Sequence, residues 1–489
     1  MNFRRHAARA LTWSWTQAAI GAVFQLVTTT VMARLLDASD FGLVALATVV
    51  VRFLAYFSQM GFGVAIVQRE HVTTAELGGL ATLSVAFGAA FTTLALALAW
   101  FLRPEVAAIM RALSLSFLIT GFTAVPYGWL RRELHNRELA VFEVIAQLVG
   151  NGAVAITLAY AGYGAWSLVI GTLVQLLLTA AAAWLAANLR GARLAFARPT
   201  PACRSYLGFG IRHSWNTFFE FLYYNADVLV IGRWYGVELT GYYNRAFSLS
   251  HLPLEQVFGS VVRVLFPVLA RLRTEHDKER QAFFAAFLLG GIFAAGFCAA
   301  MFVAAPEIVA VLFGARWATT VPLIRVFAVI VPVRYLLNMQ SAWLDAVGAL
   351  RPRTIAILAC FAIKLASLPI ALHLHFTLVQ IVATLVAPDL VWQLAYFVVM
   401  PGATHAPART LAGAYVVFLA VAAGVAAAIA ALTWQLRAWT APPTLVLQVC
   451  AGGLLVAGAV IAAVRGRLLG MRAETFLSVP IVGRLVRSG

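Results

Sequence analysis

The chain has 489 residues, of which 62% are hydrophobic and only 11% are charged, and its mean hydropathy is +0.87. This composition excludes a soluble domain, which needs far more charge to cover its surface, and indicates a protein surrounded by lipid. The net charge of +17 does not indicate nucleic-acid binding, because the basic residues stand between long apolar runs and face anionic lipid headgroups there.

Fourteen apolar segments of about 20 residues or more follow one another along the chain, as helices that cross a bilayer require. These predicted spans are 12–33, 41–67, 77–101, 107–130, 139–160, 165–189, 205–232, 241–269, 282–304, 318–346, 354–375, 377–400, 410–432 and 443–464. Basic residues between the spans favour one side by roughly three to one, which places both termini in the cytoplasm. The four cysteines are too far apart for a metal motif, so we expect no metal site.

Two short stretches between spans repeat one pattern, "ARLLDASDFG" at 33–42 and "GRWYGVELTG" at 232–241. A shift of 199 residues carries Arg34 to Arg233 and Gly42 to Gly241. We therefore predict a parallel duplication of a six-helix unit, with a substrate site where the halves face each other. The four residues are expected to form an outer gate. The alternatives are chance similarity between apolar helices and, for the gate, an ordinary hairpin turn.

Longer stretches resemble a known family. They include "MARLLDASDFGLVALATVV", "NADVLVIGRWYGVELTGYYNRA" and "LFGARW". These are similar to the bacterial polysaccharide flippases of the multidrug, oligosaccharidyl-lipid and polysaccharide exporter superfamily, clearly over about 10–350. The resemblance implies an inner-membrane protein that flips an undecaprenyl-pyrophosphate-linked oligosaccharide to the outer leaflet by alternating access. Export of exopolysaccharide, capsule or O-antigen would follow, with membrane lipids and polysaccharide polymerase machinery as partners.

The resemblance and the span count together predict an all-α polytopic fold with two pseudo-symmetric six-helix lobes and two further C-terminal helices. The expected segments are a first lobe, a solvated cytoplasmic linker, a second lobe, the two extra helices and a basic cytoplasmic tail. Their predicted limits are 1–189, 190–204, 205–400, 401–464 and 465–489.

Charged residues inside the predicted spans are the candidate site, because each costs at least about 2.5–3.5 kcal/mol to insert. The basic ones are Arg52, Arg212, Arg334, Arg263, Arg325 and Lys364. Guanidinium groups match pyrophosphate oxygens bidentately, so we predict headgroup contact for the first three, with the others behind them. Two alternatives stay open. Arg212 would pair with Glu220 or Asp227 and Lys364 with Asp389, while Arg263 and Arg325 would snorkel.

A sugar chain also needs a polar, aromatic-lined vestibule, and several residues in the same spans could supply it. They are Tyr56, Gln59, Trp215, Tyr223 and Tyr224. Coupling to H+ or Na+ would use buried ionisable groups, for which the alternative role is counter-ion to an arginine. These are Glu220, Asp227, His213, Glu255 and Asp389.

Two other functions compete with this prediction. A multidrug or organic-cation antiporter of the same superfamily would favour an acidic cavity, whereas basic residues slightly outnumber acidic ones in the spans. A polyprenyl-linked glycosyltransferase or polymerase needs a catalytic loop or an acidic metal motif, and the sequence contains no DxD. Walker motifs for ATP are also absent. We therefore predict a transporter without catalytic residues or a cofactor.

Overall fold

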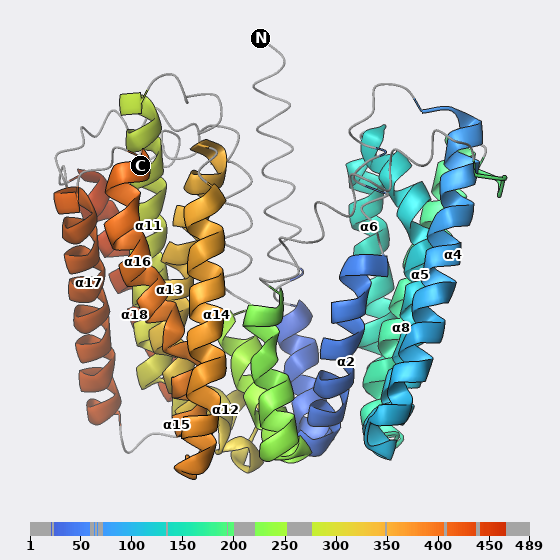
Figure 1. Cartoon of the computed structure of the whole chain (residues 1–489). Helices are drawn as coiled ribbons and strands as arrows, with labels where there is room; N and C mark the ends of the chain where they lie inside the picture. Colours follow the sequence, from blue (N-terminus) through green and yellow to red (C-terminus); the bar gives the residue numbers. More distant parts are fainter. Residues whose placement is uncertain are drawn as a thin grey trace. The chain divides into compact units, whose positions relative to one another are not determined.

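The computed structural model describes most of the chain in two units, Met1–Asn244 and Arg245–Gly489. The described ranges are 21, 24–58, 63, 66, 72–133, 135–192, 194–199, 221–251, 276–347, 350–404, 408–436 and 441–465. Every regular element within them is helical (Figure 1). Eleven of these helices are long and apolar enough to cross a membrane. The predicted all-helical membrane fold is confirmed, while the count of fourteen stays a prediction.

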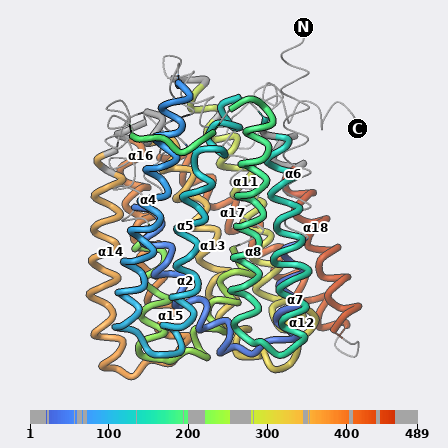
Figure 2. The backbone as a smooth tube through the Cα atoms, turned by 90° about the vertical axis from the view of Figure 1, so that its right-hand side faces the viewer, coloured from blue at the N-terminus to red at the C-terminus, as the bar shows by residue number. Residues whose placement is uncertain are grey.

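The first unit contains a helix over 24–35 and eight named elements, before two helices over 221–234 and 237–251. The named elements are α2 (Ala38–Ser58), α4 (Thr74–Leu98), η1 (Ala99–Phe101), α5 (Pro104–Arg132), α6 (Asn136–Gln147), the π-helix η2 (Leu148–Val154), α7 (Ala155–Tyr160) and α8 (Ala165–Leu189). The helices α4, α5 and α8 lie side by side (Figure 2). The unit ends inside the helix 237–251 and therefore extends beyond the lobe predicted for 1–189.

Local sequence signals explain where these helices begin and how closely they approach. The Thr73 hydroxyl accepts a hydrogen bond from the Glu76 backbone N–H at 3.2 Å, while the Glu76 carboxylate caps the Thr73 N–H, so α4 begins with a capping box. Small residues let α4 and α5 touch: the Ser84 hydroxyl donates to the Gly121 carbonyl at 2.7 Å. A Cβ at Gly88 would meet the backbone of Phe117.

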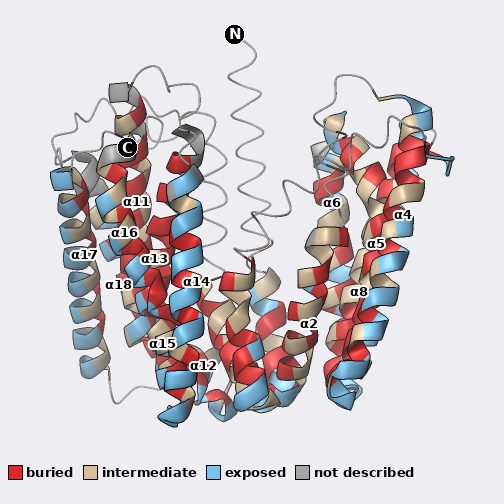
Figure 3. Ribbon diagram, in the orientation of Figure 1, coloured by how far each residue is buried: buried red, intermediate tan, exposed pale blue. Residues whose placement is uncertain are grey.

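The second unit is built around α11 and α13. Its elements are α11 (His276–Val303), α12 (Ala305–Leu312), η4 (Ala315–Trp317), α13 (Thr320–Val347), α14 (Leu350–His373), α15 (Leu378–Val386), α16 (Pro388–Thr404), α17 (Ala408–Gln435) and α18 (Ala441–Arg465). The break between the predicted spans 354–375 and 377–400 separates α14 from α15. Much of α13 is buried, whereas α17 exposes apolar residues along its length (Figure 3), as a helix facing lipid does.

The segment after α8 differs from the expected solvated linker. Ala192 and Leu194 are buried, and the ring centroid of Phe196 lies 5.5 Å from that of Trp184. The Ala197 carbonyl accepts a hydrogen bond from the Thr82 hydroxyl at 2.7 Å. Residues 194–199 are therefore docked against helices of the first unit, through the buried Leu194, the ring of Phe196 and the carbonyl of Ala197.

Candidate functional site

Arg52 is a charged residue within a candidate membrane span. It lies on α2 about 20 Å along the helix from its first residue, at 1.5 Å of rise per residue. Its side chain is exposed, while Val51 and Leu54 beside it are buried in the first unit. Arg52 forms no hydrogen bond or ion pair with the part of the chain that the structure describes. Such a charge needs water or an anion, because hydrocarbon cannot solvate it.

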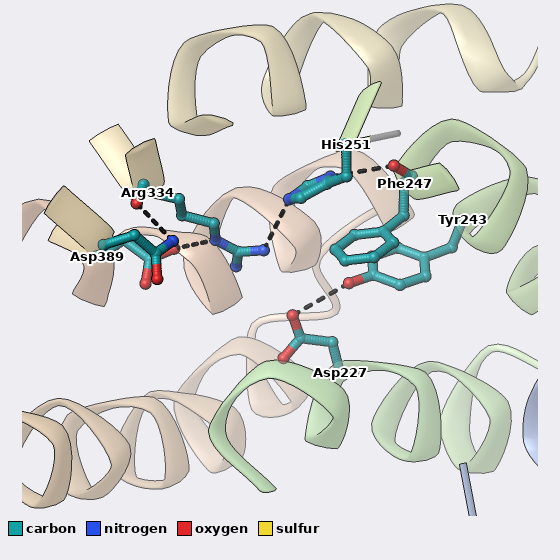
Figure 4. A network of polar contacts seen from close by, with 7 residues as sticks. Asp227, Tyr243, Phe247, His251, Arg334 and Asp389 are labelled. Atoms are coloured by element: carbon teal, nitrogen blue, oxygen red, sulfur yellow. Dashed lines mark hydrogen bonds and ion pairs between the residues drawn. The ribbon is translucent and has the colours of Figure 1, made fainter. Parts of the chain in front are cut away.

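Arg334 has a different environment, in the second unit (Figure 4). It is buried on α13, and its Nε donates to the Asp389 carboxylate of α16 at 2.7 Å. We predicted that Arg334 contacts the headgroup, whereas in the structure it forms an ion pair with Asp389. The alternative pairing of Lys364 with Asp389 stays a prediction. Lys364 is also buried, with 1% of its surface exposed. For Arg334, the structure thus favours the ion-pairing alternative.

A histidine completes this cluster. The Nε2 atom of His251 lies 3.2 Å from Nη1 of Arg334, and its Nδ1 lies 3.0 Å from the Phe247 carbonyl oxygen. A carbonyl can only accept, so Nδ1 carries the hydrogen and Nε2 offers a lone pair to the guanidinium. The ring also stacks on Phe247, with centroids 3.9 Å apart. The imidazole therefore acts as a neutral second acceptor for Arg334.

Seven of the fourteen residues in the helix 221–234 are buried. Asp227 has no exposed surface, and the Tyr243 hydroxyl donates to its carboxylate at 3.1 Å (Figure 4). Tyr223 is also completely buried, which removes it as a sugar-contacting residue in this conformation, and its ring contacts the half-buried Tyr224. Of the two tyrosines predicted for the vestibule in this helix, Tyr224 is the one with a partly exposed side chain.

The remaining predicted site residues are Arg325, the four gate residues and a group that lies outside the described part of the chain. Arg325 lies near the start of α13, exposed and 5.7 Å from the ring centre of Phe302, as a snorkelling residue would be. Among the four residues predicted for the outer gate, Arg34 and Arg233 are exposed, whereas Gly42 and Gly241 are buried. Several predicted site residues lie outside the described residues, as does the side chain of Tyr56. These are Arg212, Arg263, Gln59, Trp215, His213, Glu220 and Glu255.

Neutral glutamine and asparagine side chains also form hydrogen bonds within the two units, and we did not predict these contacts. In the first unit, Gln147 donates to Gln25 at 3.2 Å, and Asn151 donates to Gln175 beside the π-helix. In the second unit, Gln393 donates to Gln340 at 2.8 Å. The glutamine and asparagine residues inside the predicted spans could have indicated these contacts. Lipid offers no hydrogen-bond partner to a side-chain amide, so an amide within a span needs a partner in the protein.

Comparison with known proteins agrees with this architecture. Residues 31–322 match a family described as polysaccharide biosynthesis protein. The chain is 28% identical over 309 residues to the succinoglycan biosynthesis transport protein ExoT of Rhizobium meliloti (strain 1021), a match that covers 62% of each protein. It is 24% identical over 347 residues to the lipopolysaccharide biosynthesis protein WzxC of Escherichia coli (strain K12), covering 68% of each. The chain thus spans less than two thirds of the length of ExoT.

Among solved structures, the lipid II flippase MurJ in an inward closed conformation has a similar fold. Its TM-score is 0.72 at 12% identity, over 94% of this chain and 99% of that one. At this identity the similarity concerns the fold alone. The family match covers most of the region in which we saw the resemblance. The chain therefore belongs to the polysaccharide biosynthesis protein family.

Proposed function

We propose that this protein moves a polyprenyl-pyrophosphate-linked oligosaccharide from the inner to the outer leaflet of the bacterial cytoplasmic membrane by alternating access. Membership of the polysaccharide biosynthesis family supports a role in glycan export. ExoT is named a transport protein, and the fold resembles that of a flippase for another lipid-linked molecule. A transporter of this kind needs no catalytic residue, because the substrate is the same on both sides.

Arg52 carries the proposal. Its exposed guanidinium lies within a candidate span and so places a positive charge at membrane depth. No carboxylate among the described residues pairs with it. A pyrophosphate group offers the multiple oxygen acceptors that the planar fork of an arginine binds bidentately. Arg52 would therefore hold the headgroup while the polyprenyl chain stays in lipid.

The second unit contributes differently. Asp389 neutralises Arg334, so this pair would fix the packing of α13 against α16 rather than bind the headgroup. Coupling to H+ or Na+ remains part of the proposal, with Asp227 as a candidate, since Asp389 already serves as a counter-ion. Arg325 is retained as a secondary contact at the membrane surface, whereas Lys364, with 1% of its surface exposed, would reach the headgroup only after a conformational change.

Deletion of the gene tests the proposal directly. Lipid-linked repeat units should accumulate in the inner leaflet, and the wild-type gene supplied in trans should restore their export. Purified protein in proteoliposomes should then translocate a lipid-linked oligosaccharide but not a fluorescent organic cation. Unchanged export in the deletion strain, or transport of the cation alone, would contradict the proposal.

A further inference from the structure

The two repeated stretches of the sequence meet each other backbone to backbone in the first unit. A Cβ built on Gly42 would lie 2.8 Å from the carbonyl carbon of Val237 and would overlap its oxygen. A Cβ built on Gly241 would lie 2.6 Å from the carbonyl carbon of Ala38 and would also overlap its oxygen. Real Cβ atoms essentially never come closer than 3.0 Å to such atoms. Both positions therefore require glycine for the contact to exist.

These two contacts are related by the sequence repeat. The shift of 199 residues carries Gly42 to Gly241 and Ala38 to Val237, so it converts one contact into the other. A contact that maps onto itself in this way is isologous, as across a two-fold axis. Chance similarity between apolar helices would not produce it. The pairing thus supports the predicted duplication and places the two hairpins on opposite sides of a local pseudo-two-fold axis.

The first hairpin, the turn at residues 33–42, is held to the start of α8. One carboxylate oxygen of Asp40 accepts from the Ala165 backbone N–H at 2.9 Å, and the other accepts from the Asp37 N–H at 3.1 Å. Asp40 therefore joins the start of α2 to the start of α8. Gly164, which precedes α8, has a φ of 53° and sits against the same carboxylate. Movement of this bundle would carry the hairpin with it.

The second hairpin is held by its own turn. Gly236 has a φ of 90°, a left-handed conformation that suits glycine, and its carbonyl accepts from the Thr240 hydroxyl at 2.8 Å. The repeat places Leu239 where the first copy has Asp40, so the carboxylate clamp belongs to one copy only. Two separately braced turns that touch through backbone atoms can part without breaking side-chain bonds at the contact.

We infer that this glycine contact is the outer closure of the transporter, and that the absence of side chains at 42 and 241 sets how firmly the protein closes on that side. The inference rests on the proposed alternating-access function. Any side chain at either glycine would hold the hairpins apart and favour the outward-open state. The overlap is with backbone carbonyls, which cannot swing aside as the end of a flexible side chain can.

A cysteine reporter tests the closure without requiring transport. Thr48 lies one turn of α2 before Arg52, on the same helix face and half-buried. Thr48→Cys is introduced after the four native cysteines have been replaced by alanine, and a membrane-impermeant thiol reagent is added to spheroplasts. Gly42→Ala or Gly241→Ala should raise the rate of labelling from outside about tenfold, equivalent to about 1.4 kcal/mol in the closed-to-open balance.

Two comparisons make the test specific. Gly424→Ala is the matched control, because a Cβ there has nothing within 4 Å, and it should leave the rate unchanged. The Gly42→Ala/Gly241→Ala double variant should label no faster than about the faster single variant, since one overlap already opens the shared contact. Detergent melting temperature and the amount of protein in the membrane show that each variant is folded.

Unchanged labelling in both folded single variants would overturn the inference, as would faster labelling only from inside-out vesicles. Fully additive effects in the double variant would overturn the shared closure. Because labelling is independent of substrate, the proposed function is judged separately. Faster outside labelling in a protein whose deletion leaves glycan export intact would refute the function and retain the closure.

Discussion

Arg334 and Asp389 form a buried ion pair in the second unit, with 2.7 Å between the guanidinium Nε and a carboxylate oxygen. Arg334 is 4% exposed and Asp389 is 0% exposed. Removing one member of such a pair leaves an uncompensated charge in a dry environment, whereas replacing both with apolar residues of similar size often costs little. The pair therefore offers a direct test of whether Arg334 has a structural role or binds substrate.

We predict that Arg334→Met alone destabilises the protein by about 3–5 kcal/mol and that Arg334→Met/Asp389→Leu recovers most of this loss. Melting temperature in detergent and the amount of protein in the membrane measure the effect. If the pair is structural, the double variant also exports glycan. A double variant that is stable but does not export glycan would indicate that Arg334 binds the substrate.

For Arg52 the expected result is the opposite, with activity lost and stability kept. Arg52→Ala should abolish glycan export while changing stability by no more than about 0.5 kcal/mol, because the side chain is exposed. Arg52→Lys should retain a fraction of export, since an ammonium supplies charge but not the bidentate fork. Arg111→Ala removes another exposed arginine, which stacks on Trp100, and serves as the control. Normal export by Arg52→Ala would remove Arg52 from the site.

The eleven candidate spans within the described residues were predictable because each is long and apolar. Tertiary pairing was not, since one sequence does not say which helices are neighbours, and Asp389 had two basic candidates on different helices. The docked segment 194–199 was missed for another reason. Its arginines suggested a solvated linker, yet the stretch also contains apolar residues, of which Ala192 and Leu194 are buried, while the largely exposed Phe196 contacts Trp184.

The docked segment leads to a prediction about protease sensitivity. A Cβ on Gly78 would lie 2.9 Å from the Cβ of Ala197 and would crowd the backbone of Ala195. Gly78→Ala should therefore lift the segment and raise the rate of chymotrypsin cleavage after the exposed Phe196 by about fivefold. Gly424→Ala again provides a control without steric change. Equal cleavage rates in the two variants would mean that the docked segment is not held at Gly78.

Tyr415 on α17 provides the last prediction, because its hydroxyl accepts hydrogen bonds from Gln393 and, at 3.4 Å, from Gln340. Its ring lies 6.1 Å from that of Phe287 on α11, so it joins the penultimate described helix to the core of the second unit. Tyr415→Phe keeps the ring contacts and leaves the two amides bonded to each other, which predicts a loss of about 1–2 kcal/mol. Tyr415→Ala should lose about 3–5 kcal/mol, since it also removes the ring. Thermal unfolding in detergent measures both, and export by Tyr415→Phe should stay near wild type. If the Tyr415→Phe protein is stable but does not export glycan, the Tyr415 hydroxyl is required for transport.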